Sequence, residues 1–144
     1  MADYDVIIVG AGPVGMTAAL DLAQRGIRVA IIEKRDISTP ADARCNSISS
    51  RTMEMFRSLG FSEEVRASGL PDEHPTDVTY ATSFLDKPFV RIRLPSRAER
   101  YGQNGRSAPG FPDSHWLTPE PVVRLSQMYL EPVLQRKVQA CEYI

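Results

Sequence analysis

The chain has 144 residues, of which 42% are hydrophobic, and its 17 Lys and Arg nearly balance its 18 Asp and Glu, for a formal charge of −1. This length and composition predict one soluble globular domain, since such domains commonly have about 100–200 residues. The balanced charge argues against binding to nucleic acid or to an anionic membrane, because proteins of those kinds usually carry a clustered basic excess.

The N-terminal sequence and the cysteines favour a cytoplasmic protein. The uncharged stretch Val6–Leu20 is interrupted by Gly and Pro and is too short to span a bilayer. The residues before it contain no basic segment of the kind that opens a secretory signal. Cys45 and Cys141 are far apart and lack metal-ligand spacing, so we expect reduced thiols, no disulfide framework and no metal site.

The first third of the chain has the pattern of a β-α-β unit. Two short runs rich in β-branched residues, Tyr4–Val9 and Arg28–Glu33, predict buried strands. Between them, small and apolar residues at helical spacing predict a helix over Pro13–Arg25, with Pro13 in its first turn and Gly26 just past its end. We therefore expect parallel strands joined by a right-handed crossover.

The rest of the chain predicts helices, a hairpin and long loops. After a polar loop over Lys34–Ser49, we expect a helix that is capped by Ser49 or Ser50 and ends at Leu59, and then a short helix over Glu63–Ala67. A hairpin of Val78–Phe84 and Phe89–Leu94, with one exposed face, should follow. The chain then continues with an irregular segment over Pro95–Pro121 and a helix over Leu125–Gln139 that Pro132 bends. The long irregular segment suggests a lid or a crossing between domains. These elements divide the chain into a β-α-β unit with its following helices over 1–75, a hairpin and loop over 76–121, and a returning helix over 122–144.

A glycine fingerprint lies between the first strand and the first helix. In the motif Gly10-x-Gly12-x-x-Gly15, the first glycine permits a tight turn, the second lets the backbone approach a pyrophosphate, and the third lets the helix pack close to the strand. Glu33 stands at the end of the second strand, where its carboxylate would accept hydrogen bonds from a ribose and repel a 2′-phosphate. The pattern predicts dinucleotide binding, with a purely structural glycine turn as the alternative. It does not choose between NAD and FAD.

Three separated motifs carry a more specific resemblance. They are Asp5–Gly15, then Arg44-Cys45-Asn46 with Arg51, Met53, Glu54, Arg57, Leu59 and Gly60, and then Arg124–Gln127 with Leu130, Glu131, Pro132 and Leu134. Over nearly its whole length the chain resembles the N-terminal part of the single-component FAD-dependent aromatic hydroxylases, the group of p-hydroxybenzoate hydroxylase. It is most similar to the phenol, chlorophenol and polyketide hydroxylase branch of that group.

The resemblance implies both a fold and an activity. The implied fold is α/β, a Rossmann-like β-α-β FAD-binding unit with an added β-hairpin. The implied activity is hydroxylation of a phenolic or other aromatic substrate by O2, with FAD reduced by NADH or NADPH and oxygen captured as a flavin C4a-hydroperoxide. Two other functions stay open: a non-catalytic FAD- or nucleotide-binding module or subunit, and an NAD-dependent dehydrogenase domain.

The resemblance also assigns cofactor contacts to individual residues. It gives Glu33 the adenosine ribose with the basic Lys34 beside it, and Arg44 the phosphate and ribityl region. Gln127 would hold the ribityl chain, and Arg124 is a weaker candidate for the same region. An Arg fork suits a diphosphate, and a Gln amide can both donate to and accept from sugar hydroxyls. The predicted cofactor-binding residues are Gly10, Gly12, Pro13, Gly15, Glu33, Lys34, Arg44, Arg124 and Gln127.

No catalytic residue can be named from the sequence. His74 and His115 have no partner at metal or triad spacing, and Cys45 lies in no reactive motif, so we expect structural or exposed roles for them. Five aromatic residues could line an apolar substrate pocket, although packing in the core or hairpin is the favoured role for most of them: Phe84, Phe89, Tyr101, Phe111 and Trp116.

The predicted elements do not close a domain. Two parallel strands and a hairpin leave open sheet edges, whereas parallel sheets are normally covered on both faces. The motifs that in the resembled family follow the last helix do not occur in these 144 residues. We therefore expect the N-terminal portion of a longer enzyme, or a chain completed by a further chain or by a homo-oligomer, and we do not assign activity to residues 1–144 alone.

Overall fold

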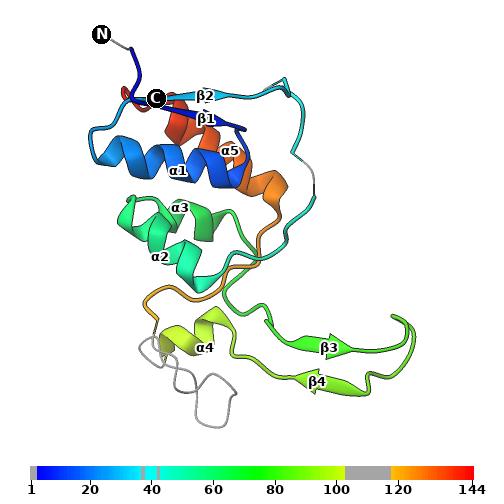
Figure 1. Ribbon diagram of the computed structural model, residues 1–144. Coiled ribbons are helices and arrows are strands. Elements are labelled where there is room, and N and C mark those ends of the chain that lie inside the picture. Colours follow the sequence, from blue (N-terminus) through cyan, green and yellow to red (C-terminus); the bar gives the residue numbers. More distant parts are fainter. Residues whose placement is uncertain (1–2, 37, 42, 103–117) are drawn as a thin grey trace.

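A parallel β-α-β unit opens the fold (Figure 1). The computed structural model describes residues 3–36, 38–41, 43–102 and 118–144. Strands β1 (Val6–Val9) and β2 (Val29–Ile32) pair in parallel, with Val6 opposite Val29 and Val9 opposite Ile32. Helix α1 (Pro13–Gln24) connects them and packs against both. The predicted unit is therefore confirmed, although both strands are shorter than expected.

Three further helices lie near α1, two of them on its side away from the sheet and α5 next to α1 itself (Figure 1). They are α2 (Ser50–Ser58), α3 (Ser62–Ala67) and α5 (Gln127–Gln139). Hydroxyl caps fix the starts of two of these helices, because the Ser49 side chain accepts a hydrogen bond from the N–H of Thr52 and the Ser126 side chain accepts one from the N–H of Met128. The core between the helices consists of Met16, Ile48, Met53, Phe56, Phe61, Val65, Val123, Leu125, Leu130, Val133 and Leu134.

Helix α5 brings the end of the chain back to the β-α-β unit. Its predicted apolar stripe is confirmed, since Leu130 and Leu134 are buried and Val138 packs against the core. It makes more contacts with α1 than with α3. After α5, the carbonyl of Tyr143 accepts a hydrogen bond of 2.8 Å from the N–H of Val29 in β2. Gln127, the cofactor candidate on α5, lines the same hollow as the first turn of α1.

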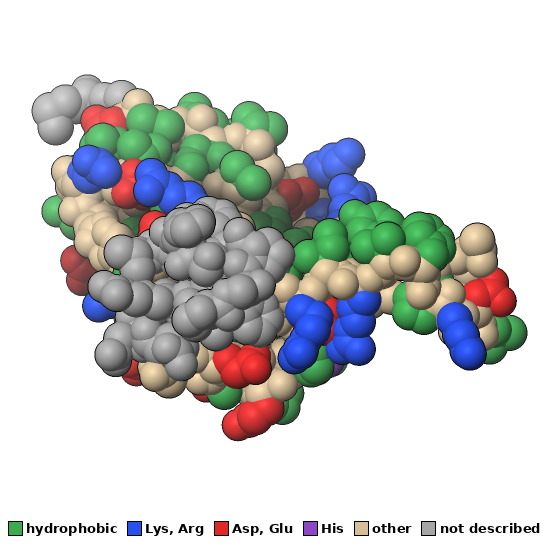
Figure 2. All heavy atoms as spheres, turned by 90° about the horizontal axis from the view of Figure 1, so that it is seen from below, with side chains coloured by type: hydrophobic (Ala, Val, Ile, Leu, Met, Phe, Trp, Pro, Cys, Tyr) green, Lys and Arg blue, Asp and Glu red, His purple; other side chains and the backbone are tan. Residues whose placement is uncertain are grey.

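The hairpin is shorter and more exposed than the sequence predicts. Strands β3 (Val78–Tyr80) and β4 (Val90–Ile92) pair antiparallel and project from the helices (Figure 1). The predicted hairpin has one exposed face, but Val90 and Ile92, which alternate with Arg91 and Arg93, are themselves 45% and 38% exposed. Hydrophobic side chains gather along this arm on the face seen in Figure 2.

A helix, α4 (Arg97–Gly102), lies in the segment predicted to be irregular. Its start is a capping box: the Ser96 hydroxyl accepts a hydrogen bond from the N–H of Glu99, and the Glu99 carboxylate accepts one from the N–H of Ser96. The prediction of a structureless segment is therefore wrong at 97–102. Residues 103–117, on which most of the expected lid falls, lie outside the described part of the chain.

Candidate cofactor site

The glycine turn between β1 and α1 has the geometry that the fingerprint predicts. Gly10 has a φ of 108°, a conformation that L side chains rarely adopt. A Cβ added at Gly15 would collide with the carbonyl oxygen of Gly10, so only glycine lets α1 pack this close to the end of β1. A Cβ at Gly12 would meet nothing within 4 Å, which leaves open space beside the backbone there.

The N-terminus of α1 faces this open space with backbone donors. Gly12 is the N-cap and supplies no side-chain hydrogen bond, and Pro13 at the start of the helix has no N–H to satisfy. The first-turn N–H groups of Val14 and Gly15 therefore have no partner four residues earlier within the helix. Together with the partial positive charge of a 12-residue helix, these donors suit an anionic group such as a diphosphate.

Glu33 lies beside the glycine turn, where the fingerprint predicts it. Its Oε2 accepts a 2.7 Å hydrogen bond from the N–H of Ala11, and its Oε1 accepts one of 2.8 Å from the N–H of Arg35. The hydrogen bonds from Arg35 and then Ala11 hold the pKa of this exposed carboxyl below its ordinary value of 4.5. The carboxylate is thus ionised at neutral pH and held as an acceptor. Lys34 follows it with an exposed side chain.

Two open hollows flank the start of α1. A hollow of about 200 Å³ lies next to Glu33 and includes Ala11 and Arg35 in its wall. A larger, mainly apolar hollow of about 590 Å³ lies on the first turns of α1 and includes Pro13 and Gln127. The remaining walls of this larger hollow are formed by Val14, Thr17, Ala18, Cys45, Ser47, Ile48, Ser49, Thr52, Met55, Phe56 and Leu130.

Backbone pairing carries Gln127 into the larger hollow. The segment before α2 runs antiparallel to the segment before α5, with a bridge between Ile48 and Val123. The N–H of Gln127 donates a 2.8 Å hydrogen bond to the carbonyl of Cys45. Gln127 and Cys45, which are far apart in sequence, are thereby placed side by side across from the first turn of α1.

The two predicted arginines differ in their positions. Arg44 has an exposed side chain and directly precedes Cys45 in the wall of the larger hollow. The guanidinium of Arg124 instead donates a 3.0 Å hydrogen bond to the carbonyl of Thr76 and lines a separate cavity of about 160 Å³. The structure therefore brings together the glycine turn, Glu33 and Gln127, and holds the Arg124 side chain apart from them.

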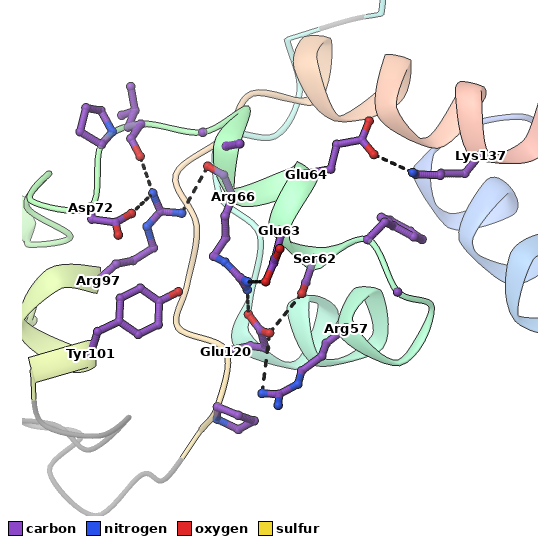
Figure 3. A pocket seen from close by; sticks show the side chains of 17 residues that line it. Arg57, Ser62, Glu63, Glu64, Arg66, Asp72, Arg97, Tyr101, Glu120 and Lys137 are labelled. Carbon is purple, nitrogen blue, oxygen red and sulfur yellow. Dashed lines mark hydrogen bonds and ion pairs between the residues drawn. The ribbon is translucent and has the colours of Figure 1, made fainter.

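Another cavity, of about 1120 Å³, lies away from α1 and shares no lining residue with the hollow around Gln127 (Figure 3). Its charges are mutually paired. Arg57 and Arg66 contact Glu120, and Arg97 contacts Asp72. Lys137 contacts a glutamate of α3. This cavity is a polar junction between helices, with no excess of either charge among its lining residues.

The other conspicuous side chains do not add to the site. Phe84 and Phe89 are exposed on the hairpin and do not pack in the core. Tyr101 lines the polar cavity, where burial raises the pKa of its phenol. His74 is exposed, as expected. Phe111, His115 and Trp116 lie outside the described residues.

The described ranges contain neither a metal-binding cluster of side chains nor a helix that could cross a membrane. Over 3–36, 38–41, 43–102 and 118–144, no three His, Cys, Asp or Glu side chains are grouped so that they could hold a metal ion. In the same ranges, no helix combines the length and the apolar character needed to cross a membrane.

The geometry around α1 is that of the dinucleotide-binding α/β proteins, in which a diphosphate meets the glycine turn and a ribose meets the acid at the end of the second strand. A family model described as "FAD binding domain" matches residues 3–143, and the chain belongs to this family. The resemblance inferred from the three motifs and the predicted α/β fold class are thereby confirmed.

Several known proteins are similar to this chain. The 2,4-dichlorophenol 6-monooxygenase of Cupriavidus pinatubonensis is 32% identical over 132 residues, which are 92% of this chain and 20% of that enzyme. The phenol 2-monooxygenase of a Pseudomonas species is 33% identical over 93 residues, 63% of this chain and 15% of that enzyme. The structure of aklavinone-11 hydroxylase in a ternary complex with FAD and aklavinone superposes with a TM-score of 0.75 at 26% identity and covers 99% of this chain and 25% of that one. The chain thus spans a quarter or less of each of these relatives.

Proposed function

We propose that this chain is the FAD-binding portion of a monooxygenase that hydroxylates a phenolic or other aromatic small molecule. The observation that carries the proposal is the shared hollow of about 590 Å³ in which Gln127 faces the first turn of α1. A cofactor whose diphosphate lies on that helix N-terminus would reach Gln127 with its ribityl chain and Glu33 with its adenosine ribose. The relatives named above include monooxygenases of dichlorophenol and phenol, which supports an aromatic substrate class.

The residues present fit FAD on physical grounds. Gly15 lets the first turn of α1 pack close to the end of β1, and Gly12 leaves its backbone open to a ligand. In the proposal, the N–H groups of the first turn bind the diphosphate, Glu33 and Lys34 hold the adenosine ribose, and Gln127 holds the ribityl hydroxyls with Arg44 nearby. Bound FAD would supply the redox chemistry, in which NADH or NADPH is the reductant and O2 the source of the oxygen atom added to the ring.

The visible spectrum of the purified full-length protein tests the cofactor. We expect the absorption bands of oxidised flavin, and FAD as the molecule released on denaturation. A colourless protein that binds NADH tightly and no FAD would instead support the dehydrogenase alternative. A yellow protein that is not reduced by NADH or NADPH with any phenolic compound present would support the non-catalytic module.

Two single variants test the assigned contacts in the same titration. Glu33→Ala should weaken FAD binding, because it removes the acceptor for the ribose hydroxyls. Glu142→Ala, near the opposite end of the chain and exposed, is the control and should bind FAD normally. Equal FAD affinity of the two variants would contradict the role of Glu33.

A further inference from the structure

A buried carboxylate lies behind the cofactor site. Glu131 of α5 is 2% exposed, and its two oxygens have different partners. Oε1 accepts a 2.6 Å hydrogen bond from Nε2 of Gln127, one helical turn earlier, and Oε2 accepts one of 2.7 Å from the guanidinium of Arg35. Sequence reasoning assigned no role to Arg35 or to Glu131.

Glu131 determines which end of the Gln127 amide faces the hollow. An ionised carboxylate is only an acceptor, so it must be the amino group of Gln127 that turns toward it. The carbonyl oxygen of Gln127 and its second N–H are then left for the hollow whose wall this residue forms. Without such a partner, the two ends of a Gln amide could exchange places.

The same carboxylate connects the two hollows beside α1. Arg35 lines the smaller hollow and Gln127 the larger one. The backbone N–H of Arg35 also donates to Glu33, whose other oxygen accepts from the glycine turn. A continuous series of hydrogen bonds therefore runs from Ala11 through Glu33, Arg35 and Glu131 to Gln127.

We propose that Glu131 is a positioning residue for the flavin cofactor: it fixes Gln127 with its carbonyl oxygen toward the ribityl hydroxyls and ties that contact to the ribose-binding segment. The inference rests on the proposed FAD site and goes beyond it, because Glu131 itself does not line either hollow. Its side chain acts through Gln127 and Arg35. The guanidinium of Arg35 carries only donors, so it requires an acceptor oxygen on Glu131 whether or not FAD is bound.

The variant Glu131→Gln tests the orientation while keeping the shape of the side chain. Arg35 would claim the carbonyl oxygen of the new amide, so its amino group would face Gln127. Gln127 would then turn over and present its amino group to the hollow. For the full-length holoenzyme and its apoprotein, we expect the dissociation constant of FAD, measured by quenching of flavin fluorescence, to rise by up to about tenfold, the effect of losing one hydrogen bond between the uncharged Gln127 carbonyl and a ribityl hydroxyl.

Glu64→Gln is the matched control. Glu64 of α3 also holds α5 in place, because it accepts a hydrogen bond of 2.8 Å from Arg136 and forms an ion pair of 2.6 Å with Lys137, but it lies away from the hollow around Gln127. If both carboxylates only stabilised the fold, the two variants would each lower the thermal midpoint of the apoprotein and the FAD affinity in parallel. We expect the FAD dissociation constant of Glu64→Gln to stay within about twofold of the wild type, because no donor at the hollow changes.

Two double variants distinguish a positioning role of Glu131 from a role that only stabilises the fold. In a Gln127→Ala background, Glu131→Gln should change FAD binding little further, since the residue through which it acts is gone. The exchanged pair Gln127→Glu with Glu131→Gln restores a donor and an acceptor in complementary places and leaves an acceptor facing the hollow, so we expect it to recover most of the affinity lost in Glu131→Gln. This exchanged pair also retains both hydrogen bonds if the single variant does not fold.

The results distinguish the inference from the proposed function. If the wild-type protein binds no FAD, the proposed function fails. If the wild type binds FAD and Glu131→Gln binds it equally well, only the positioning role is overturned. The role is equally overturned if Glu131→Gln weakens binding as much in the Gln127→Ala background as alone, or if the exchanged pair stays as weak as the single variant.

Discussion

The contact between Gly15 and Gly10 sets how close α1 lies to the sheet. Because a Cβ at Gly15 would collide with backbone rather than with a flexible side chain, Gly15→Ala must shift α1 away from β1. We expect a loss of stability of about 1–3 kcal/mol, the usual cost of overpacking. We also expect weaker FAD binding, because the first-turn donors move with the helix.

Gly102→Ala is the control for that change. A Cβ at Gly102 meets nothing within 4 Å, and the residue ends α4 away from the glycine turn. Urea denaturation and FAD titration of the two variants give the comparison. Similar behaviour of both variants would mean that the packing of α1 on the strand is not what requires glycine at position 15.

Glu33 gives the glycine turn a pH dependence. Its pKa is lowered in the folded chain by hydrogen bonds from the backbone of Arg35 and Ala11, so the ionised form is favoured by folding. The stabilisation is fully present above the ordinary carboxyl value of 4.5 and is lost as pH falls through the lowered folded value. We expect the wild type to unfold at a higher temperature than Glu33→Gln at neutral pH, and the difference to vanish in acid. A difference that persists unchanged in acid would contradict this assignment.

Glu120 joins α2 and α3 to the segment that leads into α5. Its buried carboxylate contacts Arg66 and accepts a hydrogen bond from Ser62, with Arg57 at 3.9 Å (Figure 3). Arg66, 21% exposed, keeps its contact with Glu63, so the expected cost is that of losing a hydrogen bond between charged groups, about 1.5–3 kcal/mol. We expect Glu120→Ala to lose stability on this scale, as measured by chemical denaturation.

Arg66 also contacts an exposed glutamate, which allows a comparison with the buried Glu120. Glu63 contacts Arg66 at 3.9 Å, but its side chain is 93% exposed. Glu63→Ala should therefore change stability by less than about 1 kcal/mol. Neither change lies at the hollows beside α1, so both variants should bind FAD with wild-type affinity once folded. An equal loss of stability in the two would show that burial of Glu120 is not what makes its contacts strong.

Local patterns predicted those elements whose cause is local. The β-branched runs, the Pro at the start of α1 and the serine cap of α2 are short-range signals, and each of these elements is present. Helix α4 was missed although Ser96 and Glu99 form a capping box, because the prolines around it suggested a loop. The predicted hairpin strands are longer than β3 and β4 and were expected to have only one exposed face, because alternation along a strand does not reveal whether anything packs on it.

The residues of the candidate site likewise fall into those that a local motif predicts and those that only the fold brings together. The glycine turn and Glu33 follow from one contiguous motif, and they lie together as predicted. The link between Arg35 and Glu131 spans 96 residues and could not be predicted from spacing. The i, i+4 separation of Gln127 and Glu131 was a readable signal, because residues four apart share a helix face. Arg124 could not be placed by its motif, since only the fold shows that its side chain reaches Thr76.

The described surface exposes apolar groups on the parallel sheet and on the hairpin. On the sheet, Ile7 and Val9 are 63% and 85% exposed, and the tip of the hairpin exposes Phe84 and Leu85 almost completely. Unpaired strand edges and contiguous apolar patches promote association between chains. This surface agrees with the expectation, argued from the elements alone, that residues 1–144 need further sequence or a partner to cover them.

That expectation predicts how the 144-residue chain behaves by itself. We expect it to self-associate as its concentration rises, measured by sedimentation velocity, and to bind a dye specific for apolar surface. Replacing Phe84 and Leu85 by Ser should reduce both effects, because it removes apolar area that contributes no buried contact to the described fold. Lys87→Gln, on the same exposed turn, should leave the association unchanged. A wild-type chain that stays monomeric and resists proteolysis at every concentration would mean that these 144 residues satisfy their own apolar surface.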